Sequence, residues 1–420
     1  MKSNFSNKNR ELIAPYFFIK NDMNLKYCNI DPEDSSIDEI KQEIIRLKKI
    51  KDDNENLQMA LKIFINSAYG AIGNQYFQCY NTDVAEAITT QGQDLLMYAI
   101  DSINKYFKEE WHLDVELHDK IGIRVLHQLT GNAVKYGDTD SSYVSFEEAY
   151  DSVIEWKNGK IDPIEFIRLV YKHRLNDYFI KMHEKYARKW NTENLHEFEM
   201  ESISYAGIWT SKKKYVLDMA WKDGGENGIY YKPQQKLYTK GIETSQSSYP
   251  TFARESLFGL IKFIIEKGKN FDTTVFMNKI KTLKSDFKLQ NIENISLSRN
   301  INDYEKYVLN DRNGLELESK CPIHVKAAAI HNYKLNNSKY KSKYNLIKSG
   351  NKIKYYYVKD ESKSWEVFGY AQGNFPAEIA PNFDYDLMFS NCILDPINRF
   401  MEALGKPKIP YNLVSVKTLF

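Results

Sequence analysis

Cysteine is scarce in this sequence. Its 420 residues contain four cysteines, and they lie far apart at Cys28, Cys79, Cys321 and Cys392. Such spacing excludes a disulfide framework, and the lack of a C-x-x-C pair excludes the common zinc motifs. We therefore expect a reduced protein of the cytoplasm.

Long apolar runs and an excess of charge of one sign are also absent. No run of about 18 apolar residues occurs, which excludes an ordinary membrane-spanning helix, and no membrane partner is expected. The first residues contain no apolar segment followed by a small-residue cleavage site, so secretion is not expected. The 58 basic and 56 acidic residues leave a net charge of +2, so bulk charge does not indicate a nucleic-acid binder.

The composition is that of an ordinary globular protein, with 42% hydrophobic and 27% charged residues. The chain divides into three stretches. Residues 1–75 should hold two helices that meet at a short turn, because a capping-box spacing begins at Ser36 and Asp52–Asn54 interrupts the helical pattern. Residues 76–245 mix helix and strand, which is typical of an α+β domain, and residues 246–420 are mostly helical. Within these stretches we expect helices over 85–107, 164–190 and 272–287, and strands over 202–209, 214–221, 352–358 and 365–369.

Two aspartates flank a predicted turn in the segment YGDTDS, residues 136–141. Apolar residues alternate on both sides, which predicts strand, turn and strand and lets Asp138 and Asp140 face one point. Mg²⁺ prefers such oxygen ligands, keeps several waters and accepts its remaining ligands from substrate phosphates. The alternative is that Asp and Gly are simply common turn residues. Because the whole hexapeptide lies between apolar strands, we favour metal binding.

A second pattern places polar, aromatic and glycine residues on one face of a helix. Lys62, Asn66, Tyr69 and Gly73 follow the spacing i, i+4, i+7 and i+11, with Gly70 beside them. Glycine costs roughly 1 kcal/mol relative to alanine inside a helix, so two of them here favour close approach of a ligand such as a nucleotide. The alternative is an amphipathic helix with a polar solvent face. The apolar residues off this strip are expected to bury the helix: Phe64, Ile65, Ala68 and Ile72.

Together, the two motifs resemble the B-family DNA-directed DNA polymerases. K-x-x-x-N-S-x-Y-G is similar to the fingers motif that holds the incoming dNTP, and Y-G-D-T-D-S is similar to the palm motif with catalytic aspartates. The resemblance implies catalytic roles for Lys62, Asp138 and Asp140 and two Mg²⁺ ions held by Asp138, Asp140, Glu201 and a carboxylate of a partner chain. It also implies nucleotide contacts from Lys62, Asn66, Tyr69, Gly70 and Arg46. Surface charge is the alternative interpretation of Arg46.

Later segments extend the resemblance, and the replicative polymerases of tailed phages are the most similar subgroup. Lys212-Lys213-Lys214-Tyr215 is similar to the family's K-K-R-Y strand, which grips the primer-template. Lys214 replaces the usual arginine, which keeps the charge but loses the fork of donors. Lys240-Gly241 begins a K-G-x-E element, and residues 326–359 contain nine lysines and no acidic residue. These are the expected DNA contacts, with a solvated lysine-rich surface as the alternative.

The resemblance implies the right-hand architecture of a polymerase. The fingers, with a helical hairpin, would occupy residues 1–75, and the palm, with an antiparallel sheet, residues 76–245. The mostly helical thumb and the C-terminal tail would occupy residues 246–420. The chain end VSVKTLF is similar to a clamp-docking peptide, so Leu419 and Phe420 are expected to bind a sliding clamp or to form an ordinary chain end.

Two features of a complete family member are missing. Neither the palm motif D-x-x-S-L-Y-P-S nor an exonuclease motif occurs, and 420 residues leave no room for an exonuclease domain. We expect this chain to be the C-terminal subunit of a split polymerase. It would bind primer-template DNA, dNTPs and an N-terminal chain that carries the remaining polymerase and exonuclease parts. If the protein is phage-encoded, we expect it in the cytoplasm of the bacterial host. One alternative, a non-catalytic DNA-binding remnant or regulatory subunit, predicts loss of the aspartates. Another, a reverse transcriptase or other palm-type polymerase of a different class, predicts adjacent aspartates. Without its partner, such a palm would expose strand edges and apolar surface, which predicts poor solubility.

Overall fold

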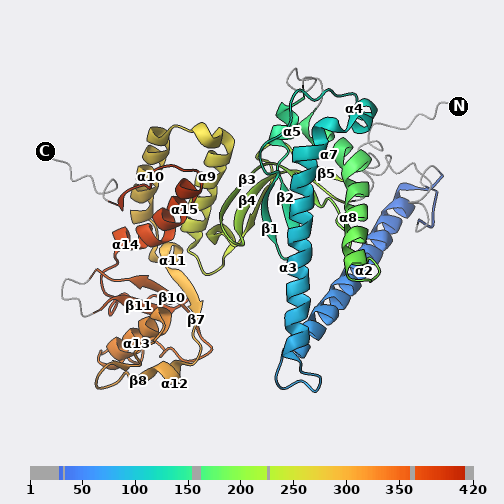
Figure 1. Cartoon of the computed structure of the whole chain (residues 1–420). Coiled ribbons are helices and arrows are strands. Elements are labelled where there is room, and N and C mark those ends of the chain that lie inside the picture. Colours follow the sequence, from blue (N-terminus) through green and yellow to red (C-terminus); the bar gives the residue numbers. More distant parts are fainter. Residues whose placement is uncertain (1–27, 32–33, 154–161, 225–227, 360–364, 412–420) are drawn as a thin grey trace. The chain divides into compact units, whose positions relative to one another are not determined.

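The structure, a computed structural model, describes most of the chain (Figure 1). The described residues are 28–31, 34–153, 162–224, 228–359 and 365–411. The chain divides into two compact units, Met1–Met97 and Tyr98–Phe420. Among the described residues, no helix combines enough length with enough apolar character to cross a membrane.

The first unit contains two long helices joined by a turn over residues 73–81. Helix α2 (Ile37–Ile72) begins at the predicted capping box. The Ser36 hydroxyl accepts the Glu39 N–H, and the Glu39 carboxylate accepts the Ser36 N–H. Helix α3 (Thr82–Lys105) follows the turn and continues past the boundary of the unit.

The predicted break at Asp52–Asn54 is wrong, because α2 runs through these residues without interruption. The Asn54 side chain donates to the carbonyl oxygen of Ile50 at 2.9 Å, and Lys51 Nζ lies 3.5 Å from Glu55 Oε1. Asp and Asn each cost no more than roughly 0.7 kcal/mol in a helix interior, which is too little to end a long helix. The helical hairpin therefore lies between α2 and α3 rather than within residues 1–75.

The apolar flank of α2 is exposed, although we expected it to bury the helix. Phe64 is 74% exposed and Ile65 is 68% exposed. Ala68 is exposed as well, and Ile72 is only half-buried. A side chain at these positions therefore contacts little of the described chain, and the helix holds its shape by its own hydrogen bonds.

A helical core opens the second unit. Its elements are the end of α3, η2 (Tyr106–Glu110), η3 (Trp111–Leu113), α4 (Val115–Ile121), α5 (Glu147–Asp151), α7 (Pro163–Val170), η4 (Tyr171–Leu175) and α8 (Asn176–Lys189). Phe107, Trp111 and Phe166 are almost fully buried, and Trp111 packs edge-on against Phe166 with ring centroids 6.0 Å apart. The helix predicted over 164–190 is confirmed as α7, η4 and α8, with a π-helical segment in its middle.

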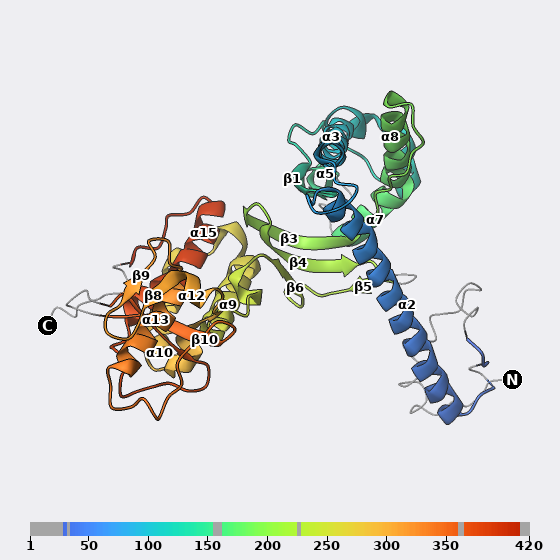
Figure 2. The ribbon, with the colours of Figure 1, turned by 90° about the horizontal axis from the view of Figure 1, so that it is seen from below.

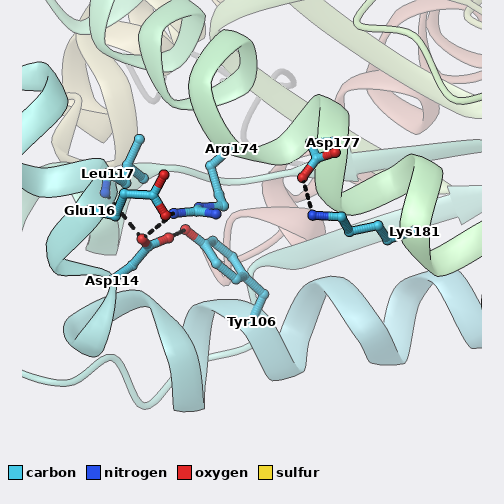
Figure 3. Close-up of polar contacts among 7 residues, drawn as sticks. All are labelled: Tyr106, Asp114, Glu116, Leu117, Arg174, Asp177 and Lys181. Atoms are coloured by element: carbon cyan, nitrogen blue, oxygen red, sulfur yellow. Dashed lines mark hydrogen bonds and ion pairs between the residues drawn. The ribbon is translucent and has the colours of Figure 1, made fainter.

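One arginine links three helical segments of this core (Figure 3). Arg174 Nη2, on η4, lies 2.6 Å from Asp114 Oδ1 and 3.2 Å from Glu116 Oε2. The Tyr106 hydroxyl donates to Asp114 Oδ2 at 2.8 Å, and Asp114 also accepts the Leu117 N–H at the start of α4. Burial raises the pKa of the Tyr106 hydroxyl, and the Asp114 charge adds to the effect.

Two antiparallel sheets follow the predicted strands. The first is the hairpin of β1 (Val134–Asp138) and β2 (Ser141–Val144). The second comprises β3 (Ser202–Ser211), β4 (Lys214–Lys222), β5 (Ile229–Tyr230) and β6 (Leu237–Lys240), with β4 paired to the other three. Figure 2 shows β3 and β4 side by side. The chain is thus an α+β protein with antiparallel sheets, as expected.

The last part of the second unit packs helices against a sheet of β11, β10 and β7. These elements are α9 (Thr251–Lys267), α10 (Thr273–Lys288), α11 (Ile292–Ile295), β7 (Leu297–Asn300), α13 (Ile323–Asn336), β10 (Lys352–Tyr357), β11 (Val367–Ala371), α14 (Tyr385–Phe389), η7 (Ser390–Leu394) and α15 (Asp395–Ala403). The predicted strands near 352–358 and 365–369 are confirmed as β10 and β11. Strand β7 was not predicted.

The lysine-rich segment 326–359 contributes more to this core than its composition suggests. Tyr344, Tyr355 and Tyr356 are buried. Three of its lysines pair with acidic residues elsewhere in the chain: Lys326 with Glu366, Lys343 with Glu378 and Lys354 with Glu293. These tyrosines therefore serve packing, whereas DNA contact by the remaining lysines of the segment stays a prediction.

Candidate metal and nucleic-acid site

The two aspartates lie at the turn of the β1–β2 hairpin. Asp138 ends β1 opposite Ser141, so Thr139 and Asp140 form the connection. Thr139 has a φ of 58°, and the Asp140 N–H donates to the Asp138 carbonyl oxygen at 2.7 Å. A turn closed over three residues with a positive central φ is rare and strained, and such strain concentrates at functional sites. The Asp138 side chain is 10% exposed, whereas Asp140 is exposed.

Aromatic rings hold this hairpin against the β3–β4 sheet. The ring of Tyr143, on β2, lies 5.4 Å from the rings of both Trp209 and Tyr215. The hydroxyls of Tyr143 and Tyr215 share a hydrogen bond of 2.6 Å, and Tyr136 completes the cluster from β1. Burial is the main cause that raises the pKa of Tyr143, and the bond to Tyr215 adds to it. The aspartate turn is therefore positioned by a rigid aromatic support, which consists of Tyr136, Tyr143, Trp209 and Tyr215.

The loop between β3 and β4 brings a lysine to the aspartates. Lys213 has a φ of 62°, and its N–H donates to the Tyr136 hydroxyl at 2.8 Å. Its Nζ lies 3.7 Å from Asp138 Oδ1. Gly241, at a φ of 65°, supports this loop from the other side, because a Cβ there would lie 2.3 Å from the Lys213 carbonyl oxygen. A glycine is required at that position.

The other predicted DNA-binding lysines lie in different environments. Lys240 Nζ lies 5.9 Å from the centre of the Tyr215 ring, and its pKa is raised mainly by Tyr215, with a smaller effect from the Asp138 charge. Lys212 is exposed. Lys214 Nζ lies 3.8 Å from Oε1 of the buried Glu243, which also pairs with Arg399 at 2.5 Å. Lys214 thus contributes to an internal ion-pair network.

The structure does not join Glu201 to the two aspartates. Glu201 is exposed just before β3, and among the described residues no group of three His, Cys, Asp or Glu side chains could hold a metal ion. The Glu201 charge contributes only a minor part of the raised pKa of Tyr143. The donor chemistry of Asp138 and Asp140 fits Mg²⁺, since both offer carboxylate oxygens at one turn. This pair needs further ligands from water, phosphate or another carboxylate.

The predicted nucleotide strip belongs to the first unit. Lys62 and Asn66 are exposed on α2, and Gln58, Leu61 and Ile65 lie beside them. Tyr69 is 43% exposed, and a Cβ at Gly70 would have no atom within 4 Å. The strip is therefore accessible to a ligand.

Arg46 has a partner within its own helix. Its Nε lies 2.7 Å from Glu43 Oε2 and its Nη2 lies 2.5 Å from Glu43 Oε1. The Arg46 guanidinium lowers the pKa of Glu43 to about 2, and the Asn29 N–H, 2.8 Å from Oε1, adds to the effect. To contact a triphosphate, Arg46 would have to leave this pair.

Comparison with known proteins bears on both the nucleotide strip and the aspartate hairpin. Residues 38–156 match DNA polymerase family B. The family-B match contains α2 with the nucleotide strip and the whole aspartate hairpin, and it ends before the lysine loop.

Individual relatives resemble a larger part of the chain. The DNA-directed DNA polymerase of Escherichia phage RB69 is 29% identical over 321 residues, which cover 70% of this chain and 32% of that protein. The DNA-directed DNA polymerase of Enterobacteria phage T4 is 27% identical over 285 residues, 65% of this chain and 28% of that protein. DNA polymerase 037L of Invertebrate iridescent virus 6 is 24% identical over 281 residues. The chain thus spans about a third or less of the length of the curated relatives that it matches.

Sequence reasoning missed the residues that connect the aspartate turn to the lysine loop. The alternation of Tyr136 and Tyr143 indicated a strand, but not their contacts with Trp209 and Tyr215, which lie more than 60 residues later. The Glu243–Arg399 pair was missed for the same reason. The available signal was the clustering of four aromatic residues beside the two polar motifs.

Proposed function

We propose that this chain carries the nucleotide-adding part of a family-B DNA polymerase, which extends a primer 3′-hydroxyl with dNTPs directed by a DNA template. One observation carries the proposal. The strained turn with Asp138 and Asp140 lies within the segment that matches the family, and it is fixed on an aromatic support beside a basic loop. Relatives named as DNA polymerases support primer-template DNA and dNTPs as substrates.

The mechanism assigns a task to each polar group of the site. Asp140 and Asp138 would hold Mg²⁺, which when bound stabilises the charge that develops at the α-phosphate during attack by the 3′-hydroxyl. The aromatic support keeps both carboxylates in place. Lys213, Lys240 and the exposed Lys212 offer positive charge to the phosphates of the primer-template. Glu201 would serve as an auxiliary metal group, although this structure does not join it to the two aspartates.

The nucleotide strip on α2 would bind the incoming dNTP. Lys62 would stabilise the triphosphate and protonate the leaving group. Asn66 and Tyr69 would shape the pocket around the new base pair, and Gly70 would allow close approach. In this proposal residues 1–75 serve as fingers, 76–245 as palm, and 246–420 as thumb and tail.

A second polypeptide would complete the site, as expected for a split polymerase. Two observations support it. The β1–β2 sheet has two strands in the described chain, and its turn offers two carboxylates rather than three. The apolar flank of α2 with Phe64 and Ile65 is exposed, and such a flank favours coverage by another protein surface. The clamp contact expected from Leu419 and Phe420 lies outside the described residues and stays a prediction.

Primer extension tests the proposal. The chain is assayed with primed template, dNTPs and Mg²⁺, alone and mixed with an N-terminal polymerase segment from the same genome. We expect extension in the mixture, and we expect Asp140→Asn to lower it by at least about 10²-fold while DNA binding remains. Asp119→Asn, which removes the same charge from an exposed position on α4, is the matched control.

Three outcomes would count against parts of the proposal. Near-normal extension by Asp140→Asn would refute the assignment of that carboxylate. Extension by the chain alone would refute the need for a partner. DNA binding without extension in either preparation would replace the polymerase by a non-catalytic DNA-binding role.

A further inference from the structure

The carboxylate of Asp138 already has a cationic partner. Lys213 Nζ lies 3.7 Å from its Oδ1, and the Asp138 side chain is only 10% exposed. The Lys213 side chain itself is 60% exposed. An exposed ammonium therefore lies next to one oxygen of the nearly buried carboxylate that the proposed function assigns to the metal.

The backbone of Lys213 is fixed although its side chain is free to move. Its N–H donates to the Tyr136 hydroxyl at 2.8 Å, and Tyr136 lies two residues before Asp138. On the other side, Gly241 approaches so closely that a Cβ would lie 2.3 Å from the Lys213 carbonyl oxygen. The ammonium can thus leave Asp138 by side-chain rotation alone, while the loop stays in place.

An ammonium and a divalent cation compete for one carboxylate. Their like charges repel at short range, so binding of the divalent ion at Asp138 disfavours the lysine there. An ion pair with one exposed partner is weak, so its release costs little. Once released, the Lys213 ammonium lies on a basic loop beside Lys212 and becomes available to an anionic phosphate.

We propose that Lys213 is a positioning residue that occupies Asp138 as a place-holding cation and moves to a phosphate of the nucleic acid when a divalent metal binds Asp138. The exchange makes metal binding and DNA binding favour one another, because the metal releases the lysine that the phosphate binds, and the phosphate draws the lysine away from the carboxylate that the metal binds. This inference rests on the proposed function, since it requires that Asp138 bind a metal.

The test uses Mn²⁺, which electron paramagnetic resonance detects, as the probe of the whole chain. Its affinity is measured with and without primer-template DNA. In the absence of DNA, Lys213→Gln should bind Mn²⁺ about two- to five-fold more tightly than the natural chain, the range for one exposed ion pair. DNA should raise the Mn²⁺ affinity of the natural chain by a similar factor but leave that of Lys213→Gln nearly unchanged. Lys222→Gln, at the other end of β4 and exposed, is the matched control.

The controls separate this inference from the proposed function. If Asp138→Asn weakens Mn²⁺ binding but Lys213→Gln leaves it unchanged or weaker, the exchange is refuted and the metal site stands. If Mn²⁺ binding does not respond to Asp138→Asn, both the exchange and the assignment of Asp138 are refuted. Circular dichroism of each variant distinguishes a changed affinity from a changed fold.

Discussion

Removal of the Arg174 side chain should destabilise the second unit far more than removal of an exposed arginine. Arg174 is 23% exposed and pairs with Asp114, whose side chain is 9% exposed. In Arg174→Ala, the Asp114 carboxylate would remain nearly buried without its counter-charge, which costs about 3–5 kcal/mol when the group is left without other partners. Asp114 keeps the hydrogen bonds from the Tyr106 hydroxyl and the Leu117 N–H, so we expect a loss of about 2–4 kcal/mol (Figure 3).

Arg188→Ala provides the matched control on α8. Arg188 pairs with Glu184 at 3.1 Å, and their side chains are 77% and 45% exposed, so its loss should cost about 0.5 kcal/mol or less. Urea unfolding followed by tryptophan fluorescence reports on Trp111 in the same core. If the two variants lost equal stability, the argument from the buried carboxylate would be refuted. Arg174→Lys, which keeps the charge, should lose less than Arg174→Ala and guards against a variant that fails to fold.

Two further predictions concern the lysine loop and the response to acid. Gly241→Ala should lower the free energy of unfolding by about 1–2 kcal/mol because of its positive φ, and it should weaken primer-template binding because its Cβ displaces the Lys213 carbonyl. The control is Gly259→Ala on α9, where no atom lies near the Cβ, and it should leave the dissociation constant for DNA unchanged. Equal dissociation constants for both variants would contradict the steric argument. Burial lowers the pKa of His183 below its usual 6.5. As the pH falls, the His183 imidazole is therefore protonated in the unfolded chain before it is protonated in the folded chain. The free energy of unfolding should thus decrease as the pH falls from about 6.5 toward the lower folded pKa. His183→Leu should flatten that part of the curve of unfolding free energy against pH, and an unchanged slope would show that His183 is not its source.

Local patterns predicted the elements that carry the candidate site. The capping box at Ser36 and the alternation around YGDTDS depend on neighbours within a few residues, and both are confirmed by α2 and the β1–β2 hairpin. The predicted break at Asp52–Asn54 is wrong because helix propensities are weak. A cost of a few tenths of a kcal/mol per residue does not end a helix whose residues before and after are helical. Of these three side chains, that of Asn54 has a partner on the helix itself, the carbonyl oxygen of Ile50.

The contacts that position the site could not be predicted in this way. The Tyr143–Tyr215 hydrogen bond and the Lys213–Asp138 ion pair join segments separated by more than 70 residues. No spacing rule connects such positions, because the sheet register and the packing of the hairpin decide which side chains meet. The same limit applies to Lys214, whose position in a basic motif predicted a DNA contact while the fold pairs it with the buried Glu243.

The aspartate hairpin is supported by aromatic packing and pairs only two strands in the described part of the chain. A two-stranded sheet is marginal in water by itself, and here one face gains stability from the rings of Tyr143, Trp209 and Tyr215. This support fixes the direction of β1 and β2 but adds no carboxylate and no strand to their edges. The packing of these rings does not by itself require a positive φ at Thr139 or an exposed Asp140. The proposed metal ligand at this turn would account for both the positive φ at Thr139 and the exposure of Asp140.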